Sequence, residues 1–315
     1  MAFETLLGND QLKKNLISAL AQRRISHFYL ISGPSGSGKH TLAKLLSAAI
    51  LCEAADAPCE ICNVCRKVMD GTHPDLITVD DPEHKNVSVK IVRQMRDDVY
   101  IRPNESNYKI YLLPQELGLE GQNALLKILE EPPAYGVFIL LTDNPERLLP
   151  TVRSRCTELA LKSLPAALLK EELAREFPQA SQDALLAAVS RSGGYLGQAR
   201  ALLEQGDALP AQTESFLQHF AAKNNLGLMQ TLVPMEKFKR DQLIPMLESW
   251  IHLLEEALAC RNGIKALHPL TAQLATQRSA QELMQAISSL QKAVLYANSN
   301  VSPAAICGYL VWHLR

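Results

Sequence analysis

The stretch GPSGSGKHT at residues 33–41 constrains the fold of this chain more than any other part of its sequence. A short apolar run, HFYLI at 27–31, precedes it, and LAKLLSAAIL at 42–51 follows it with apolar residues at helical spacing. The order strand, glycine-rich loop, helix is typical of a loop whose backbone N–H groups bind phosphate beside a helix N-terminus. The sequence therefore predicts an α/β domain built on a parallel sheet.

The loop itself matches the spacing GxxxxGK through Gly33, Gly38 and Lys39, and Gly36 is an additional small residue inside it. Glycines let successive N–H groups turn inward and let phosphate oxygens approach the backbone. Lys39 is expected to reach the outer phosphates of a nucleotide. These four residues are the candidate nucleotide-binding residues, together with Thr41.

His40 stands where such loops carry the serine or threonine whose hydroxyl binds Mg²⁺. Mg²⁺ prefers small oxygen ligands, and an imidazole is a poor substitute. Thr41 is turned by about 100° around the helix and cannot simply take over that role. The loop is thus degenerate, and the sequence leaves open whether it binds ATP and Mg²⁺ at all.

The next strand-like run, YKIYLL at 108–113, lacks the acidic residues that hydrolysis requires at its end. A hydrolytic site needs an acidic residue there to hold the metal, followed by a glutamate that polarises water. Here Pro114 and Gln115 follow the strand, and Glu116 comes one or two positions late. Together with His40, this second departure predicts a chain without ATP turnover of its own.

The remaining periodicity divides the chain into a mixed part and a helical part. GVFILLT at 136–142 predicts another buried strand, and NALLKILEEPP at 123–133 predicts a helix that its prolines end. After about residue 163 only helical patterns remain, with Ser279 and Glu282 spaced as a capping box. We expect three domains: a nucleotide-binding-like domain, a small helical lid and a C-terminal helical domain, at 1–162, 163–208 and 209–315.

In the C-terminal part the apolar residues follow single helical stripes that predict a packed core. The clearest stripe comprises Leu243, Leu247, Trp250, Leu254 and Leu258.

Four of the seven cysteines lie close together as C-x6-C-x2-C-x2-C, at Cys52, Cys59, Cys62 and Cys65. Four thiolates at this spacing can close a tetrahedral Zn²⁺ site, and they leave no position open for a substrate. We therefore expect one structural zinc ion per chain. An iron–sulfur centre and free thiols are the alternatives.

Composition excludes some classes of protein. The chain has 32 basic and 33 acidic side chains and a net charge of −1, which excludes a grossly basic nucleic-acid binder. No apolar run is long enough to span a membrane, and the first residues lack the order of a signal peptide. The expected location is the cytoplasm, with no membrane partner.

Several motifs occur in an order that resembles a known family. They are the loop at 33–41, the cysteine cluster at 52–65, GTHPDL at 71–76, NALLKILEEPP at 123–133, TVRSRC at 151–156 and YANSNVSPAAICGYLVWHL at 296–314. In this order they resemble the AAA+ clamp-loader subunits of bacterial DNA polymerase III. Over residues 1–160 the resemblance is dense, and it looks like the delta prime branch, with the tau/gamma ATPase subunit as its nearest relative.

The resemblance implies an AAA+ domain with an inserted zinc module, a helical lid and a helical collar. It also implies a hetero-oligomeric, pentameric loader with tau/gamma and delta subunits as partners. Such a loader places a sliding clamp on primed DNA at the expense of ATP. The chain would thus be a component of the DNA polymerase III holoenzyme that is itself neither polymerase nor active ATPase.

By the same resemblance, Arg155 of the SRC motif is the catalytic residue, acting in trans as an arginine finger on the ATP site of a neighbouring tau/gamma subunit. A guanidinium group is permanently charged and pairs two phosphate oxygens at once. The roles of Arg153 and Arg200 stay open, and Gly197 stands where an active subunit would present a lid arginine. Two alternatives remain: an active ATPase of tau/gamma type, and a zinc-stabilised DNA-binding module.

Overall fold

The computed structural model describes residues 3–84, 86–205, 209–263, 266, 268–299 and 301–314. It divides into two compact units, Met1–Pro178 with Ser192–Ala201, and Gln179–Arg191 with Leu202–Arg315. The boundary predicted between residues 208 and 209 adjoins a segment, 206–208, that lies outside the described residues.

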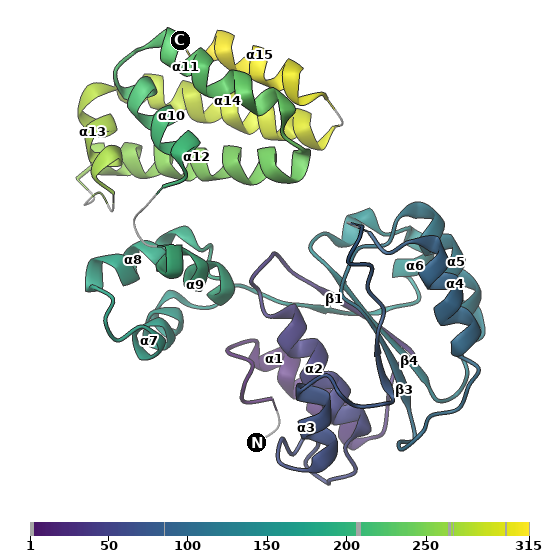
Figure 1. The fold of residues 1–315 in the computed structure, drawn as a ribbon. Coiled ribbons are helices and arrows are strands. Elements are labelled where there is room, and N and C mark those ends of the chain that lie inside the picture. Colours follow the sequence, from purple (N-terminus) through teal and green to yellow (C-terminus); the bar gives the residue numbers. More distant parts are fainter. Residues whose placement is uncertain are drawn as a thin grey trace. The chain divides into compact units, whose positions relative to one another are not determined.

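A five-stranded parallel sheet with the order β2-β3-β4-β1-β5 forms the centre of the first unit (Figure 1). In chain order its strands are β1 (Phe28–Ser32), β2 (Leu76–Thr78), β3 (Lys109–Leu113), β4 (Gly136–Thr142) and β5 (Thr157–Ala160). The three apolar runs expected to be strands are β1, β3 and β4, and all of their residues are buried. The predicted fold class, a parallel α/β sheet domain followed by helical segments, is confirmed.

Two strands were not predicted, because neither carries a continuous apolar run. β2 has three residues, and β5 has the sequence TELA with only Leu159 buried. Both lie at the edges of the sheet, so each pairs with a single neighbour. A short edge strand buries little side-chain surface, and its sequence therefore needs no apolar pattern.

Helices cover both faces of the sheet (Figure 1). On one face a shared apolar core joins Ile31 and Ile139 to α1 (Asp10–Ala21), α2 (Lys39–Leu51) and α3 (Asn63–Met69). The opposite core joins Leu30 and Phe138 to the other helices of the sheet domain. These are α4 (Val89–Asp98), α5 (Leu119–Glu130) and α6 (Pro150–Arg153), with the short 3-10 helix η1 (Pro145–Arg147) beside α6.

After β5, the regular elements of the described residues are all helices. The first unit contains α7 (Ala166–Glu176) and the start of α9 (Leu196–Gln205), and the second unit contains α8 (Gln182–Arg191). The rest of the second unit comprises α10 (Ala211–Ala221), α11 (Asn225–Leu232), η2 (Val233–Lys237), α12 (Arg240–Arg261), α13 (Pro269–Gln277), α14 (Ala280–Asn298) and α15 (Pro303–His313). No helix in the described ranges is long and apolar enough to cross a membrane.

The core of the second unit is organised around Trp250. Its ring stacks on Phe216 at 3.9 Å between centroids, and its indole N–H donates to Thr213 Oγ1 at 3.0 Å. Four residues of the predicted stripe are fully buried and Leu258 is partly buried. The predicted capping box is also present, because Ser279 and Glu282 each accept the other's backbone N–H.

A buried carboxylate holds the edge of the sheet at the start of β2. Asp75 is fully buried, and its two oxygens accept backbone N–H groups of Asn104, Glu105 and Ser106 at 2.5–2.9 Å. Burial raises the pKa of Asp75, but these N–H donors outweigh it and the net pKa is lowered. Asp75 thereby ties the segment before β3 to the strand beside it.

We expect Asp75→Ala to lower the free energy of unfolding at pH 7 by about 2–4 kcal/mol, because three backbone N–H groups lose the buried carboxylate that accepts their hydrogen bonds. Since the folded-state pKa is depressed, the contribution of Asp75 is present above the ordinary carboxyl pKa and is lost as pH falls through the folded-state value. Urea unfolding of both chains at neutral and acid pH measures this. Asp97→Ala, at an exposed aspartate of α4, is the control, and equal losses in the two variants would contradict the assignment.

Candidate functional site

The glycine-rich loop leaves β1 at its carboxyl end and runs directly into α2, whose first residue is Lys39. Gly36 and Gly38 have φ angles of 76° and 96°, in the left-handed region that favours glycine. Because β1 lies between β4 and β5, the loop sits where the direction of strand succession reverses. In open α/β sheets this is the place where ligands bind.

Lys39 is almost completely buried, and its charge is already compensated by the chain. Its Nζ donates to the carbonyl oxygens of Gly33 and Pro34 at 2.7 and 3.0 Å. The same Nζ lies 2.6 Å from Oδ1 of Asp143, the residue that follows β4. A phosphate group would have to compete with all three oxygens for this cation.

The position next to Lys39 offers no hydroxyl to a metal ion. His40 is exposed in the first turn of α2, and its pKa is lowered by partial burial and then by the cations of Lys39 and Lys44. Thr41 is half-buried in the same turn. The magnesium ligand expected of an active loop is therefore absent at its usual place.

The end of β3 is committed to holding a neighbouring loop. Gln115 accepts the N–H of Asp81 at 2.7 Å through Oε1, and its Nε2 donates to the carbonyl of Asp81 at 3.1 Å. Asp81 in turn accepts from His84 and from the N–H of Ser88. The side-chain amide of Gln115 thus both accepts from and donates to the backbone of Asp81, which fixes the loop after β2. It supplies no carboxylate that could bind a metal ion or polarise a water molecule.

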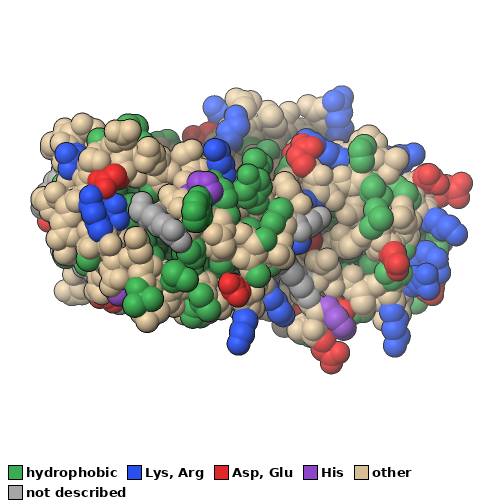
Figure 2. Space-filling view, turned by 90° about the horizontal axis from the view of Figure 1, so that it is seen from above, with side chains coloured by type: hydrophobic (Ala, Val, Ile, Leu, Met, Phe, Trp, Pro, Cys, Tyr) green, Lys and Arg blue, Asp and Glu red, His purple; other side chains and the backbone are tan. Residues whose placement is uncertain are grey.

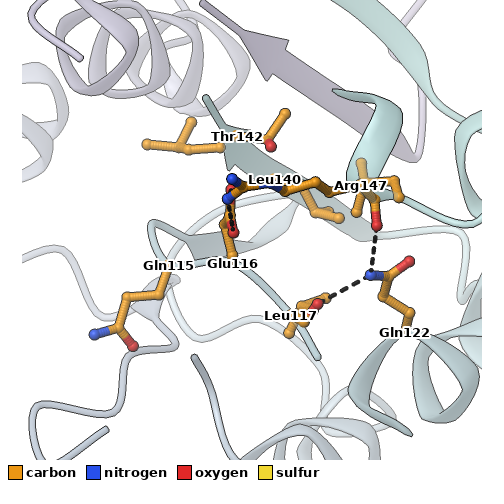
Figure 3. A pocket seen from close by; sticks show the side chains of 9 residues that line it. Gln115, Glu116, Leu117, Gln122, Leu140, Thr142 and Arg147 are labelled. Carbon is orange, nitrogen blue, oxygen red and sulfur yellow. Dashed lines mark hydrogen bonds and ion pairs between the residues drawn. The ribbon is translucent and has the colours of Figure 1, made fainter. Parts of the chain in front are cut away.

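Glu116, the acidic residue that follows Gln115, is also engaged in an ion pair within the chain. Both of its oxygens accept from Nη1 of Arg147, at 3.0 and 3.2 Å (Figure 3). Behind this pair, Gln122 donates to the carbonyls of Leu117 and Arg147. The cavity that these side chains line measures about 20 Å³, enough for about one water molecule and not for a nucleotide.

The start of α9 lies directly against the loop. The N–H of Gly197 donates to the carbonyl of Gly36 at 2.9 Å, and Nε2 of Gln198 donates to the carbonyl of Ser35 at 3.0 Å. Arg200, one turn later, pairs through two nitrogens with Glu176 and lowers the pKa of that carboxyl group. The structure thus engages Arg200 within the chain and brings Gly197 onto the loop.

The four clustered cysteines come together as predicted. Their Sγ atoms all lie within 4.8 Å of one another, with Cys52 at 3.7 Å from Cys59 and at 3.9 Å from Cys62. A disulfide needs about 2.05 Å, whereas a tetrahedral metal with bonds of about 2.3 Å to sulfur separates its ligands by about 3.8 Å. The separations fit four ligands of one metal ion.

The protonation of these thiols also fits a metal site. Backbone N–H groups of Ile61 and Cys62 lower the pKa of Cys59 to about 6, while burial raises the pKa of Cys52 and Cys65. Two buried thiols of raised pKa do not ionise readily by themselves, and a bound cation would supply the missing charge. The cluster is therefore a candidate metal centre.

Arg155 lies in the turn between α6 and β5, at the amino edge of the sheet. Its side chain is exposed, with one bond to the carbonyl of Thr151 and a 3.7 Å ion pair with Glu130. β5 pairs in parallel with β1, and the phosphate loop follows the opposite, carboxyl end of β1. At about 3.3 Å per residue, the strand separates the two by about 13 Å or more.

The neighbouring Arg153 differs from Arg155 in its partners. Its guanidinium group bridges Glu146 at 2.5 Å and Glu158 at 3.5 Å, and these pairs raise its pKa. Arg153 thus braces the turn, while Arg155 keeps its charge at the surface. Residue chemistry by itself did not separate these two arginines, and only the family resemblance singled out Arg155.

Two residues of the site, Asp143 and Gln198, and the bond between Gln115 and Asp81 were missed because the partners are distant in sequence. Asp143 contacts Lys39 across 104 positions, Gln115 contacts Asp81 across 34, and Gln198 contacts Ser35 across 163. No local pattern in the sequence links these pairs. A polar residue directly after a strand, as at Asp143, was the only available indication.

Comparison with known proteins shows that the chain is similar to subunits of DNA polymerase III. A family model described as DNA polymerase III, delta subunit, matches residues 8–165. The DNA polymerase III subunit tau of Bacillus subtilis is 34% identical over 211 residues, which cover 64% of this chain and 37% of that protein. The DNA polymerase III subunit gamma of Buchnera aphidicola is 30% identical over 238 residues, covering 73% and 62%.

The chain therefore spans less than two thirds of each of these relatives. Among solved structures, a gamma subunit-related protein of Thermotoga maritima aligns with 97% of this chain and 100% of its own, at 17% identity and a TM-score of 0.47. That score is too low to support an inference.

The contacts of Lys39 predict that Lys39→Ala destabilises the folded chain even when no nucleotide is present. Loss of three bonds from a buried ammonium group should lower the free energy of unfolding by about 1–2 kcal/mol. Thermal and urea unfolding of the purified chain in nucleotide-free buffer measure this. The control is Lys90→Ala, at an exposed lysine of α4, and an unchanged stability of Lys39→Ala would contradict the charge compensation described above.

Proposed function

Because the chain belongs to the DNA polymerase III delta subunit family, we propose that it is a clamp-loader subunit of the delta prime kind, which takes part in DNA replication without hydrolysing ATP itself. The observation that carries this proposal is the state of the strand end at Pro114 and Gln115. The side-chain amide of Gln115 bonds to the backbone of Asp81 and holds that loop, and neither Pro114 nor Gln115 carries a carboxylate that could bind a metal ion. His40 and the internally compensated Lys39 support the same conclusion.

The second part of the proposal is that Arg155 acts on the ATP site of a neighbouring tau/gamma subunit. Its position at the amino edge of the sheet is too far from the chain's own loop for action in cis. The exposed guanidinium group of Arg155 has one weak ion pair, with Glu130, and breaking this pair costs little free energy. The group is then available to bind the phosphates of a nucleotide on another chain. There it would stabilise the charge that develops on the transferred phosphoryl group.

The proposed assembly is a pentameric loader that also contains tau/gamma and delta subunits and acts on a sliding clamp and primed DNA in the cytoplasm. In this assembly residues 1–162 would form the AAA+ domain, 163–208 the lid and 209–315 the collar. The second unit presents exposed apolar side chains at helical spacing, namely Leu226, Met229 and Val233. A surface of this kind supports a helical domain that packs against other subunits.

An active ATPase of tau/gamma type is the second candidate, and one observation favours it. Relatives that match 64–73% of this chain at 30–34% identity carry the names tau, gamma/tau and gamma. Retention of the glycines and of Lys39 is compatible with it. ATP turnover by the isolated chain that depends on Mg²⁺ would decide for this candidate.

The third possibility, an autonomous DNA-binding module, has less support from the surface. On the face that Figure 2 shows, lysine and arginine side chains are interspersed with aspartate, glutamate and hydrophobic side chains. A surface that binds DNA on its own gathers positive charge along one face. The role in DNA replication is therefore proposed through the assembled loader.

We also propose that the metal of the four-cysteine cluster is zinc and that its role is structural. Cys52, Cys59, Cys62 and Cys65 would hold it, and four sulfur ligands leave no coordination position for a substrate. The ion would tie the end of α2 to the start of α3. Bound ATP and Mg²⁺ are not part of the proposal for this chain.

The purified chain should show no ATPase above background, and Arg155→Ala should depress the DNA-stimulated ATPase of a loader reconstituted with tau/gamma and delta subunits. Loss of a charge-stabilising donor should slow turnover at the site next to Arg155 by about 100-fold or more. Steady-state phosphate release from the reconstituted loader measures this. Other ATP sites in the loader would retain their activity.

Two further variants sharpen this experiment. Arg155→Lys keeps the charge but loses the planar pair of donors, so its turnover should lie between those of the wild type and of Arg155→Ala. Arg96→Ala, at another arginine that pairs with an exposed aspartate, should behave as the wild type. Normal loader activity in Arg155→Ala would sink the assignment of Arg155 as the finger.

Metal analysis of chain prepared without chelator should find about one zinc ion per chain. Protons compete with the metal for the four thiolates, so zinc should be released as the pH is lowered and retained at neutral pH. Cys59→Ser should weaken retention, whereas Cys260→Ser, at a cysteine outside the cluster, should not. Full zinc occupancy in Cys59→Ser would argue against a four-cysteine site.

A further inference from the structure

The contact between the phosphate loop and α9 is made by backbone on backbone. A Cβ atom on Gly197 would lie 2.6 Å from Cα of Gly36 and 2.9 Å from its carbonyl oxygen. In the other direction, a Cβ atom on Gly36 would lie 2.6 Å from the backbone nitrogen of Gln198. Real Cβ atoms do not approach backbone atoms so closely, and a backbone cannot move aside as the end of a flexible side chain can. Only glycine fits on either side.

Hydrogen bonds join the same two segments. The N–H of Gly197 donates to the carbonyl of Gly36 at 2.9 Å, and the side chain of Gln198 donates to the carbonyl of Ser35 at 3.0 Å. At the base of this segment, the N–H of Leu164 donates to the carbonyl of Gly194 at 2.8 Å. The loop and the start of α9 are thus held at two points by bonds that require close approach.

The two glycines have different reasons to be glycine. Gly36 has a φ of 76°, which favours glycine even without a neighbour. Gly197 is an ordinary helical residue of α9, where alanine is normally the better helix former. In this structure, position 197 therefore requires glycine because the backbone of Gly36 approaches it so closely.

We propose that Gly36 and Gly197 form a steric latch, which holds the start of α9 closed on the phosphate loop, and that the size of the residue at 197 decides whether this loop is closed. A side chain at 197 as large as the lid arginine expected of an active subunit cannot coexist with the closed contact. Glycine at position 197 thus permits the closed contact, which a larger side chain at this position would prevent. The latch rests on the proposed function only in assuming that a closed loop is compatible with the role of this subunit.

The test uses hydrogen–deuterium exchange of the full chain, read at the amides of residues 34–38 and 196–199. In Gly197→Ala these amides should exchange at least about tenfold faster than in the wild type, because the bond to Gly36 is broken. The melting temperature should fall, although alanine is the better helix former. Gly308→Ala is the matched control: Gly308 is exposed in α15 with open space around it, so its melting temperature should stay the same or rise.

A second variant, Gln198→Ala, keeps both glycines and removes only the bond to Ser35, so it should accelerate exchange at the same amides less than Gly197→Ala. It provides a reading even if Gly197→Ala does not fold. Unchanged exchange in Gly197→Ala together with a raised melting temperature would overturn the latch, as would unchanged exchange in Gln198→Ala if only that variant folds. The Arg155 variants report on the proposed function separately, since Arg155 is distant from this contact.

Discussion

The compensated charge of Lys39 determines what the phosphate loop can do in this protein. A buried ammonium group costs several kcal/mol unless it is paired and hydrogen-bonded. Here two carbonyls of the loop and the carboxylate of Asp143 meet that requirement from within the chain. The loop is consequently stable without a phosphate ligand. Its conformation couples β1, β4 and α2, and the start of α9 closes over it at Gly36.

The two edges of the parallel sheet have different roles as a result. At the carboxyl edge, Gln115 bonds to Asp81 and Glu116 pairs with Arg147, and both contacts hold neighbouring loops. At the amino edge, Arg155 remains at the surface beside Arg153, whose guanidinium group forms ion pairs with two glutamates. Parallel strands make such a separation unavoidable, because their two ends are about 13–16 Å apart.

Prediction from sequence succeeded where a residue type had a local cause. The buried strands β1, β3 and β4 have continuous apolar runs, and the four cysteines are close in sequence as well as in space. It failed for β2 and β5, since an edge strand that buries few side chains carries no apolar pattern. Without the family resemblance it also left Arg153 and Arg155 equivalent, because an ion pair depends on which carboxylates the fold brings near.

The sequence by itself determined the strand–loop–helix order around the glycine-rich loop, the clustering of four cysteines and the placement of Pro114 and Gln115 directly after β3. Each of these depends on residues that lie within about 25 positions of one another, so spacing alone is informative. Only the tertiary structure decided that Lys39 is neutralised by Asp143 and that Gly197 rests on Gly36. Those contacts join residues more than a hundred positions apart, and their strength comes from burial and close approach, which no local pattern encodes.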